Sequence, residues 1–444
     1  MSIRKILGRT GLVLVVLAAA LLVVRATLNY TTGKKLEKFL AEAKAKGLAV
    51  SYTDLGPACP GLENAKPLWK AAAALFDGQY KAKTNFNPEL AKLFETQLID
   101  EKSRSLIRTG IEKNRRSIDL LLEAAGRPCF RETDRRVFSD QSIIRDYIST
   151  LHLIKLLGFE AFFRAEHGDV RGGLNEWIQG YRLVRLMMQE PAIITALISI
   201  ANAKSLLALL DRIVDGRAVE VDDLAAVLNE LDVAAWRAAV AGSWKGERIL
   251  RIETGRDILG GRLDALEEGR GRRFLLWLAR PWVRSQIMRQ YSLCDEIDDM
   301  FRVPYYKSRP RMNAFDDRQE HQHWYERIPD GGVSGISATG LKEASLEALM
   351  ETARIGLAAR IYTAREKHFP TALAELLPGL SSREPLDPFT GKPLVFRVDK
   401  DGLLVYSFGS NEKDDGGRGT FLIAQLVQKS NDDWAWRDSF RSGK

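Results

Sequence analysis

The pattern of apolar and polar positions divides the chain into an apolar start, a long helical region and a shorter mixed tail. Residues 12–24 are all apolar, three bases precede them, and the first 26 residues contain no acid. A basic start followed by such a run is typical of export signals and membrane anchors. We therefore expect residues 1–28 to form a signal or anchor helix.

The apolar run leaves the fate of this helix open. A helix of 13 residues is roughly 20 Å long, which is shorter than the ~30 Å hydrocarbon core of a bilayer. A retained anchor would place Arg25 at the interface, where its long side chain can reach water. Bases lie on both sides of the run, so charge alone does not decide the orientation. The signal-like order predicts a single-pass inner-membrane protein with a periplasmic bulk, and secretion after cleavage near Ala26 is the alternative.

The region that follows has the apolar spacing of helices. Residues 142–165 carry an apolar side chain at every third or fourth position. A turn at 167–169 leads to a second helix over 170–189 and a third over 191–214. This hairpin resembles a tetratricopeptide unit, but a stable solenoid needs at least three such repeats. We therefore predict an irregular, tetratricopeptide-like helical bundle for residues 29–335.

The pattern changes after a glycine-rich stretch at 330–340, which is the best linker candidate in the chain. A long amphipathic helix is predicted over 341–367. Two short apolar runs then flank an Asp-Gly turn at 399–402, which predicts a β-hairpin. The predicted fold is mainly α, with three domains: a signal or anchor helix (1–28), an α-helical domain (29–335) and a small α+β domain (336–444).

Composition narrows the class of protein. Hydrophobic residues make up 45% and charged residues 28%, which is ordinary for a folded domain and excludes disordered, collagen-like and polytopic membrane classes. The net charge is +8, and four of the bases lie in the first 26 residues. This excess is too small to indicate nucleic acid as a partner. The membrane, through the N-terminal helix, and other envelope proteins are the partners that we expect.

One internal segment departs from the even charge distribution. Residues 270–289 contain six arginines and no acid, and Trp277 and Trp282 lie among them. Such a segment can lie on an anionic bilayer surface. The alternative, which we prefer at this point, is a helix end with solvated arginines.

The three cysteines allow one disulfide. Cys59 and Cys129 lie in proline-containing, loop-like stretches, and Cys294 lies in a predicted helix. In an oxidising compartment Cys59 and Cys129 could pair and leave Cys294 buried and free. Three unpaired thiols are the alternative.

Four short motifs follow one another in the tail. His-Phe-Pro at 368–370 is followed by Asp-Pro-Phe-Thr-Gly-Lys-Pro at 387–393, Tyr-Ser-Phe-Gly at 406–409 and Asp-Asp-Gly-Gly at 414–417. This order resembles the C-terminal part of the major pseudopilin of type II secretion systems, over residues 341–436. The whole chain also resembles uncharacterised exported bacterial proteins that contain Glu-Asn-Ala in their helical region, here Glu63 to Ala65.

The resemblance implies a calcium site, because the acidic loop binds calcium in the pseudopilin family. Calcium takes six to eight oxygen ligands, mostly from carboxylates and carbonyls. The matching loop holds Asp414 and Asp415, and Asp432 and Asp433 could close it. A solvated acidic turn is the alternative. The pseudopilin leader has a Gly and, shortly after it, a Glu, but no acid lies near Gly8 or Gly11 here. We therefore do not expect the chain to be processed and polymerised as a pilin.

Motifs of catalysis are missing from the sequence. It has no Gly-x-Ser-x-Gly, no phosphate-binding loop and no His-Glu-x-x-His. His321 and His323 could bind zinc on a strand, but their surroundings favour exposed polar residues. We predict a membrane-anchored, exported, non-catalytic interaction or scaffold protein. The alternatives are an accessory component of a type II secretion or pilus-type machine, docking through 341–367, and an envelope hydrolase with an unrecognised site.

Overall fold

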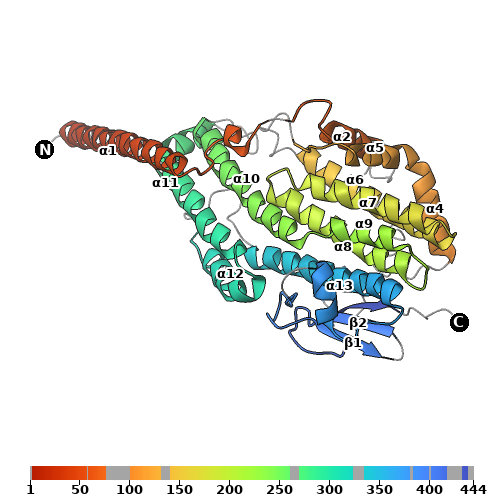
Figure 1. Cartoon of the computed structure of the whole chain (residues 1–444). Helices are drawn as coiled ribbons and strands as arrows, with labels where there is room; N and C mark the ends of the chain where they lie inside the picture. Colours follow the sequence, from red (N-terminus) through yellow and green to blue (C-terminus); the bar gives the residue numbers. More distant parts are fainter. Residues whose placement is uncertain are drawn as a thin grey trace. The chain divides into compact units, whose positions relative to one another are not determined.

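The protein is mainly helical, with a three-stranded sheet near its C-terminus (Figure 1). Its contacts group the chain into two compact units. Unit 1 comprises Met1–Gly56, Trp244–Asp299 and Ala314–Ser334, and unit 2 comprises Pro57–Ser243, Met300–Asn313 and Gly335–Lys444. The computed structural model describes residues 3–57, 59–76, 101–131, 141–260, 270–323, 335–380, 384–399, 402–417 and 433–438.

Unit 1 contains the N-terminal helix and the helices that pack on its end. The predicted anchor and the lysine-rich segment after it form one continuous helix, α1 (Ile3–Ala45). The end of α1 joins a core of buried side chains with α10 and α11: Ala43, Val50, Ile252, Ile258, Val283, Ile287 and Tyr291. The elements that lie wholly or partly in unit 1 are α1, η1 (Tyr52–Leu55), α10 (Val233–Gly260), α11 (Arg270–Phe301) and α12 (Tyr305–Glu320).

Two helices in the described part of the chain are long and apolar enough to cross a membrane. One is α1, in which the apolar window is not buried at all and Val15 to Val24 expose half or more of each described apolar side chain. The other is α8 (Ile193–Val214), whose window is 61% buried inside unit 2. The predicted N-terminal apolar helix is therefore present.

Unit 2 begins with a layer of helices. The helices of this layer are α2 (Lys66–Leu75), α4 (Glu101–Lys113), α5 (Arg115–Ala125), α6 (Gln141–Glu166), α7 (Val170–Met187), α8 and α9 (Val221–Glu230). Within this layer, α4 and α5 meet at Asn114. The Asn114 side-chain amide donates to the carbonyl of Gly110 at 2.9 Å. It therefore competes with backbone N–H groups for this carbonyl at the end of α4.

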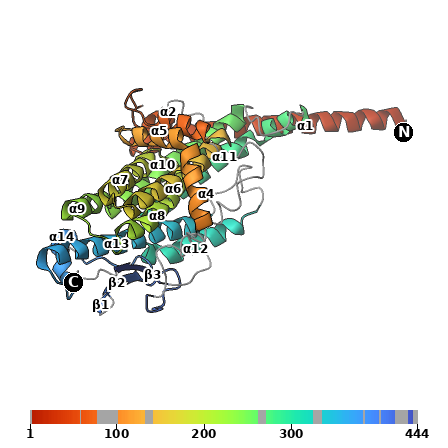
Figure 2. The same cartoon turned by 90° about the vertical axis from the view of Figure 1, so that its right-hand side faces the viewer.

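The long C-terminal helix lies at the centre of unit 2. α13 (Ile336–Glu366) packs against α8 and α9 on one side and against the sheet on the other (Figures 1 and 2). The short elements η4 (Leu373–Leu376) and α14 (Leu377–Leu380) follow it. Because α13 is covered on both sides, α13 and the sheet belong to the same unit as α8 and α9.

The sheet has strand order β1-β2-β3, and both pairs are antiparallel. The predicted hairpin is confirmed by the pairing of β1 (Val395–Asp399) with β2 (Gly402–Ser407), although residues 400–401 of its turn lie outside the described residues. The third strand, β3 (Trp434–Asp438), was not predicted. Its Trp436 is fully buried against Gly356 of α13.

Candidate functional site

A pocket in unit 2 brings together polar residues from four segments. It lies where the start of α10, the start of α12, the middle of α13 and the loop after α14 meet, and its volume is about 230 Å³. It is lined by Arg237, Pro304, Tyr306, Glu347, Glu351, Glu384, Pro385, Leu386, Asp387 and Pro388.

Two of the three glutamates that line this pocket, Glu347 and Glu351, come from one face of α13, and Glu343 lies one turn before them. Glu343, Glu347 and Glu351 are spaced by four residues, so they follow one another along the helix surface. The side chains of Glu347 and Glu351 are only 14% and 13% exposed. Partial burial of three neighbouring carboxyl groups disfavours their charged forms.

Burial raises the pKa of Glu347 to about 7, and the negative charges of Glu351 and Asp387 act in the same direction. Arg237 opposes this shift, with its Nη1 3.6 Å from Glu347 Oε1. Burial also raises the pKa of Glu343 to about 8. Repulsion by Glu347 adds to this shift, and attraction by Arg237 opposes it. These two carboxyl groups therefore change charge near neutral pH.

Glu351 differs because it has a close basic partner. Arg354 Nη1 lies 2.8 Å from Glu351 Oε2, and the other end of the guanidinium donates to the carbonyl of Leu380 at 2.7 Å. Burial raises the pKa of Glu351, while Arg354 opposes the shift. Glu351 thus has a close basic partner, whereas Glu347 lies farther from Arg237, at 3.6 Å.

Asp387 has a structural role in the same pocket. It is fully buried, and its Oδ1 accepts hydrogen bonds from the backbone N–H groups of Phe389 and Thr390 at 2.8 and 2.9 Å. Its Oδ2 accepts from the N–H of Phe408 at 2.8 Å. The Asp-Pro-Phe-Thr-Gly-Lys-Pro motif is therefore a turn that one carboxylate ties to the end of β2.

The glycine of this motif allows α12 to approach the turn. Gly391 has φ +71°, and a Cβ at this position would lie 2.6 Å from the ring of Tyr306. The N–H of Tyr306 donates to the carbonyl of Pro388 at 3.1 Å. The turn and the start of α12 are thus joined, and together they form one wall of the pocket.

The geometry allows two kinds of chemistry. A carboxyl group with a pKa near 7 can donate or accept a proton at neutral pH, which general acid–base catalysis requires. The same group, when ionised, can bind a cationic group. The sequence carries one sign of this pocket, which is the spacing of Glu343, Glu347 and Glu351 by four residues within an otherwise apolar helix. Arg237 and Asp387 come from distant segments and could not have been placed.

The predicted calcium ligands are partly engaged in the protein's own hydrogen bonds. Asp414 Oδ1 accepts from the Tyr406 hydroxyl at 2.8 Å and from the N–H of Gly416 at 2.9 Å. Asp415 Oδ2 accepts from the side-chain amide of Asn411 at 2.7 Å. These bonds connect the two carboxylates to β2 and to the rest of the loop.

Asp433 joins this loop to the sheet. It is fully buried, and its Oδ2 accepts from the N–H of Gly417 at 2.6 Å. Burial raises the pKa of Asp433. Asp432 lies outside the described residues. Among the residues that are described, no group of three or more His, Cys, Asp or Glu side chains is placed to hold a metal ion, and calcium binding stays a prediction.

The two histidines that we considered as zinc ligands lie in unit 1 and are exposed. His321 Nδ1 donates to the carbonyl of Asp317 at 2.7 Å. His321 lines a shallow pocket beside the ion pair of Arg318 with Glu296, in which Nη2 and Oε1 are 2.5 Å apart. This arrangement is typical of solvated surface residues.

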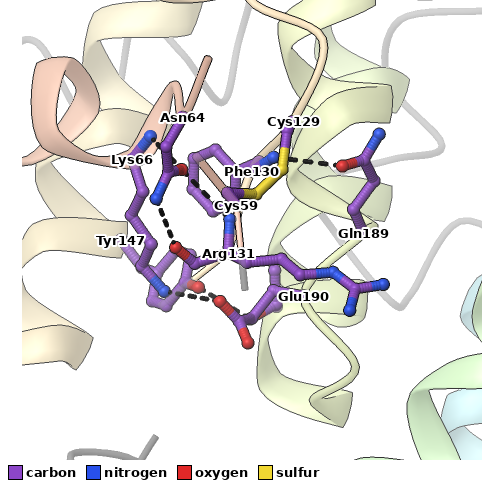
Figure 3. Close-up of polar contacts among 10 residues, drawn as sticks. Cys59, Asn64, Lys66, Cys129, Phe130, Arg131, Tyr147, Gln189 and Glu190 are labelled. Carbon is purple, nitrogen blue, oxygen red and sulfur yellow. Dashed lines mark hydrogen bonds and ion pairs between the residues drawn. A yellow bond between two sulfur atoms is a disulfide. The ribbon is translucent and has the colours of Figure 1, made fainter. Parts of the chain in front are cut away.

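Of the two alternatives for the cysteines, the structure has the disulfide between Cys59 and Cys129, with the two Cα atoms 6.1 Å apart (Figure 3). Cys294 is free and buried, as expected. The disulfide joins the segment before α2 to the segment after α5. A backbone hydrogen bond of 2.7 Å from the N–H of Ala65 to the carbonyl of Cys129 continues this junction.

A buried ion pair lies next to the disulfide (Figure 3). Lys66 Nζ is 2.9 Å from Glu190 Oε2, and the two side chains are 3% and 2% exposed. The ammonium group also faces the rings of Trp69, Phe130 and Tyr147, whose centroids are 5.9, 5.3 and 6.0 Å from Nζ. The cluster is almost fully buried, so its two charges are matched by each other and by the surrounding rings.

Asn64 explains part of the Glu-Asn-Ala motif. Its side-chain amide donates to the carbonyl of Arg131 at 2.8 Å, and its Oδ1 accepts from the N–H groups of Lys66 and Arg131 at 3.0 and 3.2 Å. The Asn64 side chain thus connects the first residue of α2 to the backbone of Arg131, which follows the disulfide. The motif has a structural role here.

No family model, no curated protein and no solved structure matches the chain.

Proposed function

We propose that the chain is a membrane-anchored, exported, non-catalytic interaction or scaffold protein. The exposed apolar segment of α1 carries this proposal. The described large apolar residues from Val15 to Val24 are exposed, whereas α8, which is even more apolar, has 61% of its apolar window buried. An apolar helix surface of this size is stable in contact with a lipid bilayer or a partner rather than with water.

The disulfide supports export of the bulk. Disulfides form and persist in oxidising compartments such as the bacterial periplasm, and Cys59 and Cys129 are paired here. We propose a single-pass inner-membrane protein with a periplasmic bulk, with secretion after cleavage near Ala26 as the alternative. In this proposal the C-terminal part is a pseudopilin-like domain that serves interaction, and its acidic loop binds calcium.

The topology can be tested with a reporter fused after Lys444. We expect an alkaline phosphatase fusion to be active and a cytoplasmic fluorescent reporter to be dark. A fusion that is active only in the cytoplasm would refute export.

The partners can be tested by crosslinking cells, solubilising the membranes and identifying the proteins that copurify with the tagged protein. We expect these to be envelope proteins.

A role in a type II secretion or pilus-type machine has less support. Docking through 341–367 requires a free face of that helix, and most apolar side chains of α13 are buried within unit 2. Recovery of secretin, pilin or secretion-ATPase components in the crosslinking experiment would nevertheless favour this role.

The pocket on α13 favours an envelope hydrolase as a second candidate. Glu347 has the pKa of an acid–base catalyst and lies beside Arg237. The test is a screen of the purified full-length protein with chromogenic esters, glycosides and peptides. An activity that Glu347→Gln abolishes and the exposed Glu366→Gln leaves intact would support the hydrolase. Activity that is equal in both variants would argue against this pocket.

A further inference from the structure

Three arginines gather where the exposed apolar segment of α1 ends. Arg25 directly follows that segment, and Arg280 and Arg284 lie on α11 in the same unit. The Arg25 guanidinium lies over the Trp277 ring, 3.1 Å from its centroid, and its Nη2 donates to the Trp277 carbonyl at 2.7 Å. Arg25 therefore lies flat against α11 instead of extending freely into solvent.

The other two arginines also donate to uncharged acceptors. Arg284 Nη1 donates to the backbone and side-chain oxygens of Asn29 at 2.7 and 2.6 Å. Arg280 Nη2 donates to the carbonyl of Leu259 at 3.2 Å. These bonds use only some of the five N–H donors that each guanidinium has.

The positive charge of this cluster is not balanced by the described part of the chain. Among the described residues, no carboxylate lies within ion-pair distance of Arg25, Arg280 or Arg284. Arg25 and Asn29 are one helical turn apart on α1, and Arg280 and Arg284 are one turn apart on α11, so the contacts of Arg25 with Trp277 and of Arg284 with Asn29 bring the three guanidinium groups to one place. Three guanidinium groups held together without an acid favour an anion between them.

The position of the cluster indicates which anion. If α1 enters a bilayer with its apolar segment, Arg25 lies at the level of the headgroups, where lipid phosphates are concentrated. Trp277 and Trp282 are partly exposed on the same stretch of α11, and tryptophan is enriched at this level of membrane proteins. The arginine-rich segment thus combines a helix that packs on α1 with a charged surface.

We propose that Arg25, Arg280 and Arg284 form a binding site for the phosphate of an anionic phospholipid headgroup. This inference rests on the proposed membrane anchor. The site would hold α11 against the bilayer surface next to α1, and it would give the protein a preference for anionic over zwitterionic lipid.

The test uses the full-length protein, purified in a mild detergent and freed of lipid. Phosphatidylglycerol or phosphatidylcholine is then added, and bound lipid is counted by native mass spectrometry while the melting temperature is recorded. We expect phosphatidylglycerol to remain bound and to raise the melting temperature, and phosphatidylcholine to do neither. Equal effects of the two lipids would overturn the proposal.

Two variants locate the site. Arg280→Glu should weaken the retention of phosphatidylglycerol by about tenfold or more, because it replaces a phosphate donor with a repelling charge. Arg284→Lys keeps the charge and should retain part of the binding. The matched control is Arg318→Glu, an exposed arginine of unit 1 with the same change of charge. Wild-type retention in Arg280→Glu, or an equal loss in the control, would contradict the proposed site.

Two further measurements separate the possible failures. If inorganic phosphate alone stabilises the protein as much as phosphatidylglycerol does, the site binds free anions and the lipid proposal is wrong. Alkaline carbonate extraction of membranes, with the intact mass of the protein, tests the anchor itself. A protein that stays in the membrane but shows no lipid preference refutes only the binding site, whereas an extracted protein refutes the anchor.

Discussion

Lys66 and Glu190 are charged side chains in a place that water does not reach. Their mutual attraction offsets the cost of removing both charges from water, and the surrounding aromatic rings add a favourable interaction with the ammonium group. Such a pair is sensitive to the loss of one partner, because the other then remains buried and uncompensated.

We expect Glu190→Ala to lower the free energy of unfolding by about 3–5 kcal/mol. Chemical denaturation followed by circular dichroism measures this change. Glu37→Ala removes the carboxylate from an exposed pair with Lys34 and should cost less than about 1 kcal/mol. An equally small loss for Glu190→Ala would show that the pair is not buried as described.

The raised pKa values of Glu343 and Glu347 predict a pH dependence of stability. Each carboxyl binds its proton more tightly in the folded protein than its ordinary pKa of 4.5 would allow. The contribution of these bound protons to the free energy of unfolding is complete below about pH 4.5. It is lost as the pH rises through about 7 for Glu347 and about 8 for Glu343.

Glu343→Gln should therefore stabilise the protein at pH 8 by about 1–3 kcal/mol and change little at pH 4.5. Urea denaturation at both pH values gives the difference between the variant and the wild type, so other titrating groups cancel. Glu366→Gln, at an exposed position of the same helix, serves as the control. A constant difference between Glu343→Gln and the wild type across this range would contradict the assignment.

At the scale of elements, α13 depends on close packing from both sides. A Cβ at Gly356 would lie 2.3 Å from Nε1 of the buried Trp436, so β3 can approach α13 only where the helix lacks a side chain. This close approach adds to the buried apolar packing of Ile355, Ala358 and Ala359 against Leu403 and Val405 of β2.

Gly356→Ala should destabilise the protein by about 1–3 kcal/mol, although alanine favours a helix by about 1 kcal/mol. Gly242→Ala in α10, where nothing lies within 4 Å of the added Cβ, should instead be neutral or slightly stabilising. Thermal or urea unfolding compares the two variants. A stabilising effect at both positions would mean that Trp436 can move away without cost.

Elements with a strong local pattern could be predicted from the sequence, and those that depend on distant partners could not. The helical spacing of 142–214 and the Asp-Gly hairpin are local signals, and α6 to α8 and the β1–β2 pair are confirmed. β3 is a short segment whose strand form depends on pairing with β2. The pocket likewise needs Arg237, Glu347 and Asp387, which are far apart in sequence.

At the scale of the whole molecule, the disulfide links the stability of the protein to the redox state of its surroundings. Cys59 and Cys129 are 70 residues apart in sequence, and the bond restricts the unfolded chain accordingly. The ion pair of Lys66 with Glu190 and the bonds of Asn64 lie beside it. Reduction would therefore act on the junction that fixes the start of α2.

We expect Cys59→Ser/Cys129→Ser to lower the free energy of unfolding by about 2–5 kcal/mol. Denaturation of the wild type with dithiothreitol should give a similar loss, and dithiothreitol should not change the double variant further. Cys294→Ala leaves the disulfide intact and should keep the dithiothreitol effect. An unchanged wild type under reducing conditions would contradict a stabilising disulfide.

α1 is one continuous helix of 43 residues, roughly 65 Å long, and its last part belongs to the core of unit 1. No loop separates the apolar end from the packed end. If the apolar end is inserted in a bilayer, the continuous helix would therefore restrict how unit 1 can tilt and rotate relative to the membrane. Partners diffusing in the same membrane would meet unit 1 in a narrow range of orientations, which a flexible tether would not provide.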